Sequence, residues 1–302
     1  MIDLKNLNLE GLNIPVEDLK ELKQGIEQLI SNTLPIQSEP EVKILADSIS
    51  GSGERLTTFE LTFWRPILPE LNRHRALTQT VRSSRATPTA TLIQEIQESP
   101  WGPCEWGLNQ KGMVADNTVT DPKVALSLNH LWTGAARSAC SIASALADAK
   151  IHKQIVNRLL EPFSCSHAVV SATEWDNFFE LRCASDAQPE MQRLANLMRD
   201  ALQDSQPSEL GADEWHLPYI TAQDLQKYSI QNCCRISAAR CARVSYKTYD
   251  GSIDPEKDLE LYLKLVESKH YSPLEHVATP AQNHYMLSNF IGWNQLRKFE
   301  ES

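Results

Sequence analysis

The alternation of side chains between residues 42 and 64 constrains the fold of this 302-residue chain more than any other feature. In the run Leu56–Phe63, apolar residues such as Phe59, Leu61 and Phe63 recur at every second position. Side chains two positions apart point to the same face of a strand, so this run predicts a strand with one buried face. The preceding letters SGSGE are typical of a tight turn. We therefore predict a β-hairpin over residues 42–64.

Helical periodicity dominates most of the remaining chain. Apolar residues three or four positions apart predict several helices, whereas CSHAVVS at 165–171 predicts a further strand. Residues 236–246 fit a helix or a strand equally well. The predicted helices are a segment that carries Asn72–Arg85, a long helix that begins at Asp121-Pro122 with Val124, Leu128, Leu131, Ala135, Ile142 and Leu146 on one stripe, residues 174–182, residues 187–202 and a segment that begins at Pro255. This mixture predicts an α/β (α+β) fold with one main sheet.

The first 40 residues have the pattern of an appendage to this fold. Five aliphatic residues between Val16 and Leu29 lie at helical spacing after Pro15, and the polar stretch SNTLPIQSEPE follows them. An amphipathic helix of this kind needs a surface against which to bury its apolar stripe, and we expect it to dock without a catalytic role. We therefore predict an N-terminal helical extension at 1–40 and a main domain at 41–302.

The composition narrows the class of protein. A net charge of −10 argues against a general nucleic-acid-binding surface, which is normally basic. No apolar run reaches the roughly 18 residues of a membrane helix, and the N-terminal letters MIDLKNLNLEGL do not resemble a signal peptide. Seven cysteines without a CxxC pair are typical of free thiols in a reducing compartment. We therefore expect a soluble, cytoplasmic protein.

One local stretch departs from the acidic average of the chain. Between Glu70 and Glu95 there are four arginines and no acidic residue. On a helix, Arg75, Arg82 and Arg85 would share a face, where their like charges repel unless an anion or distant carboxylates lie between them. The planar guanidinium suits a phosphate, and neighbouring serines add hydroxyl donors. The stretch therefore predicts an anion-binding site, with a solvated basic face or pairing with acids elsewhere as the alternative.

A second cluster combines aromatic rings with an arginine. If the segment around it is helical, Trp175, Phe178 and Arg182 share one face, whereas Asn177 points about 140° away from Arg182. This face is either an aromatic core face that ends in a surface arginine or part of a ligand site. In the second case Asn177 and Arg182 would contact different partners.

Two weaker features lie near the C-terminus, and several common motifs are absent. SPLEH at 272–276 places Glu275 beside His276, whose imidazole can titrate near neutral pH, although such a short run is commonplace. Arg240 and Arg243 suggest another basic edge. The sequence has no GxGxxG, GxxxxGK[ST], HExxH or GxSxG motif, and no spaced Cys/His set for zinc. A cofactor would therefore be held by side chains rather than by a glycine-rich loop.

Together, these clusters resemble the signature motifs of the flavin-dependent thymidylate synthase family. Arg73-His74-Arg75, seven residues and then Ser83-Ser84-Arg85-Ala86 is similar to the family's RHR, seven residues and S-x-R-Y. WDNFFELRCASDAQ at 175–188, ARVSY at 242–246 and SPLEH at 272–276 resemble three other family segments. The last two precede RHR in the family, so this chain resembles a rearranged, permutation-like member. A permutation can preserve a site, because a site depends on spatial proximity.

The resemblance implies one main, mostly antiparallel sheet flanked by helices, and a reductive methylation of dUMP to dTMP. It implies FAD as redox cofactor, NADPH as reductant and methylenetetrahydrofolate as carbon donor, with a site completed across the subunits of a homotetramer. It also implies roles for individual residues. The flavin-binding positions are Arg73, His74, Arg75, Asn177, Ser245 and His276; the positions that bind the pyrimidine nucleotide are Ser83, Ser84, Arg85, Arg158 and Arg182; and Ser83, Arg182 and His276 are the catalytic candidates.

The chain departs from the family pattern at several positions. Thr80-Val81 replaces an Asn-Glu pair, Ala86 replaces a tyrosine, and Ser171 and Thr173 stand where the family has asparagine and arginine. Loss of the motif carboxylate could shift the base preference or the outcome of the reaction. The alternatives are therefore methylation or hydroxymethylation of another pyrimidine nucleotide, such as dCMP, and a non-catalytic protein whose basic stretch binds nucleotides or nucleic acid.

Overall fold

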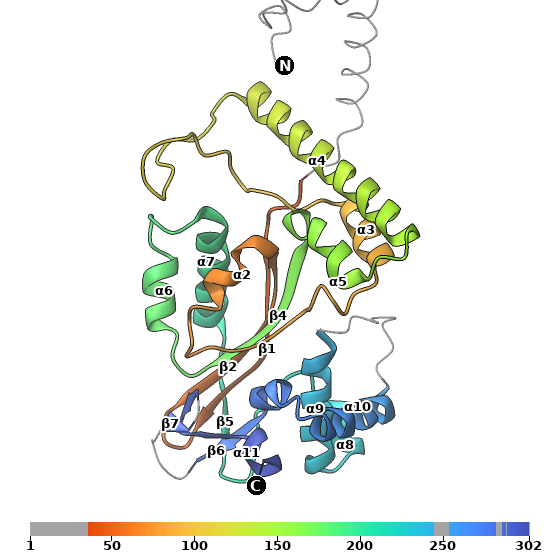
Figure 1. The fold of residues 1–302 in the computed structure, drawn as a ribbon. Coiled ribbons are helices and arrows are strands. Elements are labelled where there is room, and N and C mark those ends of the chain that lie inside the picture. The colour runs from red at the N-terminus through yellow and green to blue at the C-terminus, as the bar shows by residue number, and fades with distance from the viewer. Residues whose placement is uncertain (1–35, 245–253, 282–285, 288, 302) are drawn as a thin grey trace, which may run out of the picture. The chain divides into compact units, whose positions relative to one another are not determined.

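The computed structural model describes residues 36–244, 254–281, 286–287 and 289–301 (Figure 1). Contacts divide the described residues into two compact units, one within the ranges 1–38 and 88–164 and the other within the ranges 39–87 and 165–302. The main sheet belongs to the second unit.

The predicted hairpin is present in the second unit. Strand β1 (Glu41–Ser50) pairs antiparallel with β2 (Arg55–Trp64). The amide of Ser50 donates to the carbonyl of Glu54 over 3.0 Å, which closes the turn. Gly53 adopts a φ of +90° in this turn, a conformation that a residue with a Cβ rarely adopts. The conformation of this turn therefore explains why a glycine occupies position 53.

The hairpin forms the middle of a five-stranded sheet. Its strand order is β3 (Thr78–Val81), β4 (Cys165–Ala172), β2, β1 and β5 (Ser208–Leu210). Every neighbouring pair is antiparallel except β1 and β5, which are parallel. The expected α/β (α+β) fold with one mostly antiparallel sheet is confirmed, as is the strand at 165–171.

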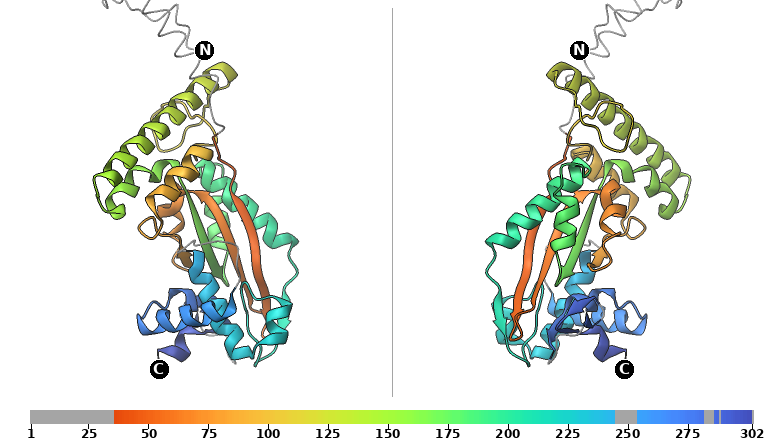
Figure 2. Two further views of the ribbon diagram at one scale, coloured as in Figure 1. Left: turned by 90° about the vertical axis from the view of Figure 1, so that its right-hand side faces the viewer. Right: turned by 90° about the vertical axis from the view of Figure 1, so that its left-hand side faces the viewer.

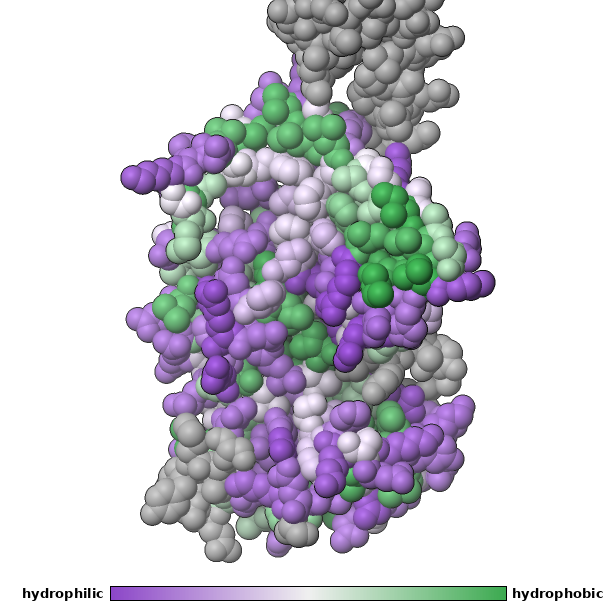
Figure 3. Space-filling model, in the orientation of Figure 1, coloured by the Kyte–Doolittle hydropathy of each residue, from purple (hydrophilic) through white to green (hydrophobic). Residues whose placement is uncertain are grey.

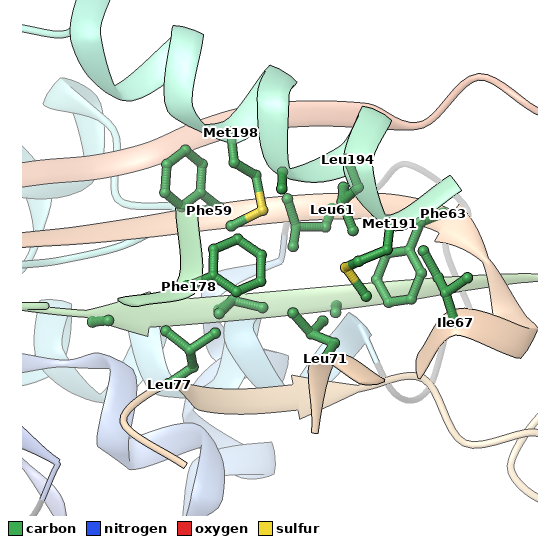
Figure 4. Close-up of a cluster of buried hydrophobic side chains, with 14 of the residues drawn as sticks. Phe59, Leu61, Phe63, Ile67, Leu71, Leu77, Phe178, Met191, Leu194 and Met198 are labelled. Carbon is green, nitrogen blue, oxygen red and sulfur yellow. The ribbon is translucent and has the colours of Figure 1, made fainter. Parts of the chain in front are cut away.

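One face of this sheet carries the main core. Helix α7 (Pro189–Asp204) covers it with a row of buried apolar residues, and α6 (Asp176–Arg182) lies beside α7 (Figures 2 and 4). Phe59, Leu61 and Phe63 of β2, the alternating residues of the sequence pattern, are fully buried against Met191, Leu194 and Met198. Each such side chain stabilises the fold by about 1.5–3 kcal/mol through burial alone.

A second group of elements belongs to the same unit. The ambiguous segment 236–246 falls largely within a helix, because α9 ends at Arg243. This group consists of α8 (Ala222–Lys227), α9 (Ile230–Arg243), α10 (Pro255–Glu267), the 3-10 helix η5 (Ser272–His276), the paired strands β6 (Ala278–Pro280) and β9 (Trp293–Gln295), the paired strands β7 (Met286–Leu287) and β8 (Phe290–Ile291), and α11 (Arg297–Glu300).

The predicted basic edge at Arg240 and Arg243 is wrong. Arg240 is buried and donates to the carboxylates of Asp224 (2.7 Å) and Asp258 (3.0 Å), and Arg243 also pairs with Asp258. A buried guanidinium needs such partners, because an uncompensated charge in the interior is strongly destabilising. These arginines therefore hold α8, α9 and α10 together.

The first unit contains α3 (Thr89–Glu98), the long helix α4 (Pro122–Asp148), α5 (Lys153–Val156) and the 3-10 helices η2 (Asn157–Leu159) and η3 (Glu161–Phe163). Helix α4 begins as predicted, with the Asp121 carboxylate accepting from the amide of Lys123 over 2.8 Å. None of the helices in the described part of the chain is long and apolar enough to cross a membrane.

Most of the predicted apolar stripe of α4 does not face the interior of this unit, although Leu146 packs against its core. Its buried face consists of the smaller residues Thr133, Ala136, Cys140 and Ala143, which allow α3 to approach closely. By contrast, Leu131 is 62% exposed. Figure 3 shows hydrophobic surface over parts of this helix. The periodicity was therefore right for a helix but wrong for its buried face.

Candidate active site

The RHR segment lies in a turn and not on a helix. Helix α2 (Leu68–Leu71), which follows η1 (Arg65–Ile67), ends two residues before Arg73, and the amide of Leu77 donates to the carbonyl of His74 over 3.1 Å. The chain then enters β3, whose β-branched residues pair with β4. The expectation that Arg75, Arg82 and Arg85 share a helical face is therefore wrong, because sheet pairing determines the conformation after the turn.

A cavity of about 810 Å³ opens beside this turn. Four predicted flavin positions line it: Arg73, His74, Arg75 and Asn177. The start of α6 supplies Asn177, and the C-terminal part of α7 forms a further part of the lining. Small-molecule sites commonly have cavities of roughly 300–1,000 Å³. The fold thus brings motifs about 100 positions apart to one cavity of ligand size.

The cavity has an aromatic wall formed by residues at the start of α6. Trp175 stacks on Phe179 with ring centroids 6.0 Å apart, and Phe178 meets the edge of the His74 ring at 5.0 Å. The indole Nε1 of Trp175 is buried, and no residue in the described ranges accepts a hydrogen bond from it. Buried polar groups are normally paired, so this atom is a candidate donor to a ligand.

Two cations at the cavity are available to bind an anion. Arg73 and Arg75 are exposed, and no acidic side chain in the described part of the chain forms an ion pair with either. In contrast, Arg55 is paired with Asp47 and Arg199 with Asp200 at the same cavity. Unpaired guanidinium groups beside aromatic rings favour a ligand that combines phosphate with a planar ring system.

Arg182 lies at the edge of this site in a fixed position. Its Nη1 donates to Oε2 of Glu70 over 2.8 Å, and its Nε donates to Nε2 of His74 over 2.9 Å. Burial lowers the pKa of His74, and the charge of Arg182 lowers it further. His74 is therefore neutral at physiological pH. The helical face predicted from Trp175, Phe178 and Arg182 is real, and it combines core packing with this polar contact.

The segment after β3 carries the residues that were expected to bind the nucleotide. Arg82 donates its amide to the carbonyl of His167 over 2.8 Å, and a turn follows in which the amide of Ala86 donates to Ser83. Ser84 is buried, Ser83 is half-buried and Arg85 is exposed. The turn therefore presents Arg85 to solvent, while Arg82 points inward and donates to Thr87 over 3.1 Å.

Two other predicted residues are placed differently. Arg158 belongs to the first compact unit, where it forms an ion pair with Glu161 at 2.8 Å. Ser245 lies outside the described residues. Neither placement tests its predicted role.

His276 is enclosed in the interior of the second unit. Its Nδ1 lies 2.8 Å from the hydroxyl of Ser171 and its Nε2 lies 2.9 Å from that of Thr80. The ring is fully buried, which lowers its pKa to about 3. Both ring nitrogens are thus bonded to protein, and a direct contact with flavin or substrate would need a rearrangement of this segment. The structure places His276 as a support of the sheet.

The contacts of His276 extend into a buried polar network. Ser171 also contacts Thr58 over 2.6 Å, and Thr58 contacts Nε2 of His216 over 2.7 Å. The other ring nitrogen of His216 lies 2.9 Å from the hydroxyl of Ser48. Sequence reasoning found neither this network nor Glu70, because isolated hydroxyls and a single glutamate carry no recognisable spacing. The replaced family positions Thr80 and Ser171 are members of it.

The profile of the family described as thymidylate synthase complementing protein matches residues 56–208, just over half of the chain. The chain belongs to this family, the flavin-dependent thymidylate synthases. It is therefore a thymidylate synthase-like methyltransferase. The matched range includes the RHR segment and the aromatic cluster of α6, whereas ARVSY and SPLEH lie beyond it.

Solved structures with similarity to this family member include two kinds of enzyme. The UMP/dUMP methylase PolB from Streptomyces cacaoi, bound with 5-Br UMP, is 17% identical over 56% of this chain and 91% of its own, with a TM-score of 0.45. The flavin-dependent thymidylate synthase ThyX from Helicobacter pylori, complexed with FAD and dUMP, is 23% identical over 49% of this chain and 67% of its own, with a TM-score of 0.34. No curated protein sequence matches the chain.

Proposed function

We propose that this enzyme methylates dUMP reductively to dTMP, with FAD as redox cofactor, NADPH as reductant and methylenetetrahydrofolate as carbon donor. The observation that carries the proposal is the cavity that gathers Arg73, His74, Arg75 and Asn177 in a chain of this family. A non-catalytic nucleic-acid-binding role is not retained, because the family match identifies an enzyme.

The residues at the cavity fit FAD. Arg73 and Arg75 supply two guanidinium groups without a protein carboxylate for the pyrophosphate, and the aromatic wall with Trp175 suits a planar ring system. The buried Nε1 of Trp175 and the amide of Asn177 add polar groups for orientation. When bound, the flavin would supply the hydride that reduces a methylene group on the pyrimidine to methyl.

In this proposal the nucleotide is bound by the turn that follows β3 and by Arg182. Arg85 offers an exposed guanidinium to the phosphate, and the hydroxyls of Ser83 and Ser84 lie in the same turn. Arg182 uses two of its five N–H donors on Glu70 and His74, so donors remain for the pyrimidine or its phosphate. Cationic donors on a uracil carbonyl would draw electron density from the ring and favour attack there. Arg158 remains a predicted nucleotide-binding residue in this proposal.

The rearranged order of motifs still brings the SPLEH segment against the strand that follows the RHR segment. The SPLEH segment follows the RHR segment in the sequence, yet His276 contacts β3 and β4 directly. Proximity of this kind supports a permuted main domain at 41–302, with residues 1–40 as an extension. Completion of the site in a homotetramer is part of the proposal, and the exposed Ile142, Ile155 and Leu131 give the first unit apolar surface for a partner.

A second candidate is the same chemistry on another pyrimidine nucleotide, or a reaction that stops at hydroxymethylation. The hydroxyl of Thr80 contacts His276, and Val81 packs against the core, so neither replaces the carboxylate of the family motif. We propose a cytoplasmic location from the seven cysteines, all of which are free thiols.

Turnover assays separate these candidates. The purified enzyme is supplied with FAD, NADPH and methylenetetrahydrofolate, and the product from dUMP or dCMP is identified by mass spectrometry. The leading proposal predicts dTMP from dUMP. A methylated or hydroxymethylated cytidine nucleotide, without dTMP, would establish the second candidate, and no product from either nucleotide would contradict both.

A further inference from the structure

Glu70, Arg182 and His74 form a hydrogen-bonded row at the edge of the cavity. Glu70 comes from α2 and accepts from Nη1 of Arg182 over 2.8 Å, and Arg182 at the end of α6 donates its Nε to His74 over 2.9 Å. The Arg182 side chain is largely buried, at 17% exposure. The ion pair with Glu70 therefore fixes the orientation in which the Arg182 guanidinium faces His74.

The direction of the second hydrogen bond determines the tautomer of His74. An arginine N–H can only donate, so Nε2 of His74 must accept and carries no proton. In a neutral imidazole the proton then resides on Nδ1. A doubly protonated ring would place two donors and two positive charges opposite each other, which disfavours that form.

We propose that Glu70 is a positioning residue that, through Arg182, holds His74 as the neutral Nδ1–H tautomer. In this form His74 presents a hydrogen-bond donor to an acceptor atom, a carbonyl oxygen or ring nitrogen, of a heteroaromatic ligand in the cavity. No residue in the described ranges accepts a hydrogen bond from Nδ1 of His74. His74 itself lines the cavity beside the aromatic wall. The identity of that ligand as a flavin rests on the proposed function.

Removal of the Glu70 carboxylate would affect both Arg182 and His74. Without the carboxylate, Arg182 loses the partner that fixes its guanidinium plane and regains side-chain freedom. His74 would then exchange between tautomers, because nothing would oblige Nε2 to accept. Glu70 itself is only half-buried, so its replacement should not unfold the chain.

Nitrogen NMR of histidine-labelled protein tests the tautomer without any ligand. The His74 signals are assigned by their loss in His74→Gln, and couplings to the carbon-bound ring protons identify the protonated nitrogen. We expect protonated Nδ1 and bare Nε2 in the wild type, and a tautomer mixture in Glu70→Ala. Glu180→Ala, which removes an exposed acid from the same helix as Arg182, should leave the spectrum unchanged. A protonated Nε2 in the wild type, or an unchanged ring in Glu70→Ala, would overturn the proposal.

Titration with FAD provides the second readout. Glu70→Ala should weaken FAD binding about tenfold, the weight of one hydrogen bond with a charged network behind it, and Glu70→Gln should lie between this variant and the wild type. Failure of the wild type to bind FAD would refute the proposed function but leave the tautomer result standing. Normal FAD binding with the wrong tautomer would refute only the role of Glu70.

Discussion

The hydroxyl of Thr80 lies 2.9 Å from Nε2 of His276, although 196 positions separate the two residues in the sequence. Thr80 belongs to the strand before the nucleotide loop, and His276 belongs to a motif that was expected to contact flavin. The contact makes His276 a buried support for β3. Strand β3 leads into the segment that binds the nucleotide in our proposal, and a contact from the C-terminal part of the chain therefore supports this strand.

Removal of this support should destabilise the fold. His276→Ala leaves the hydroxyls of Ser171 and Thr80 without their buried partner and creates a cavity, so we expect a loss of about 2–5 kcal/mol in the free energy of unfolding. Urea denaturation followed by circular dichroism measures it. His270→Ala, which alters an exposed histidine, should cost less than about 0.5 kcal/mol. Equal stability of the two variants would mean that the network does not stabilise the fold.

The two buried histidines predict a dependence of stability on pH. Burial lowers the pKa of His216 and His276 to about 3 in the folded chain, against 6.5 for a free imidazole. The unfolded chain thus binds more protons, so their contribution to stability is present above pH 6.5 and is lost progressively as the pH falls toward the folded values. Each imidazole should cost about 1.4 kcal/mol per pH unit in that window.

The carboxylate of Asp224 and the variant His276→Asn serve as controls for the dependence of stability on pH. The hydrogen bond from Arg240 lowers the pKa of Asp224 to about 2, so its contribution is lost only below about pH 4. Between pH 6.5 and 4.5 the slope therefore belongs to the histidines whose pKa is lowered in the folded chain, which are His216, His276 and, to a smaller extent, His74. His276→Asn should reduce this slope by somewhat less than half. A slope that is flat in this window, or unaffected by the variant, would show that the imidazoles titrate normally.

Arg73 and Arg75 should contribute to flavin affinity and not to folding. Each is exposed and lines the cavity, so replacement by alanine should weaken FAD binding by about 1.5–3 kcal/mol, or more than tenfold, with an unchanged melting temperature. Arg193→Ala is the control, because the Arg193 side chain is partly exposed and pairs with Glu39, and neither residue lines the cavity. Fluorescence titration with FAD gives the affinities; similar values for all three variants would place the flavin elsewhere.

Arg85 should separate nucleotide binding from flavin binding. It is exposed in the turn after β3, so Arg85→Ala should weaken dUMP binding at least tenfold, the effect of losing a charged hydrogen bond, while FAD affinity stays the same. Arg85→Lys should recover part of the affinity, because it keeps the charge but loses the planar fork. Isothermal titration calorimetry distinguishes these outcomes. Unchanged dUMP affinity in Arg85→Ala would exclude this turn from the nucleotide site.

Local patterns predicted those parts of the molecule that depend on neighbouring residues. The alternation of Phe59, Leu61 and Phe63 predicted β2 and its buried face, and Asp121-Pro122 predicted the start of α4. The four lining residues Arg73, His74, Arg75 and Asn177 came from motif resemblance, and the structure places them at one cavity.

Contacts between distant segments could not be predicted in this way. Strand β3 was expected to be helical, because its pairing partner in β4 is remote in sequence. The same holds for Glu70 and Arg182, which are 112 positions apart. The buried face of α4 depended on the small side chains that admit α3, which the helical period alone does not reveal.

In our proposal, the cavity beside the RHR segment holds a flavin. The visible absorbance spectrum of the enzyme, purified and then incubated with FAD and desalted, tests it most directly. We expect a yellow protein with the absorption of oxidised flavin in the wild type, and loss of most of this absorption in the double variant Arg73→Ala/Arg75→Ala. A colourless wild type, or equal flavin retention by both proteins, would contradict it.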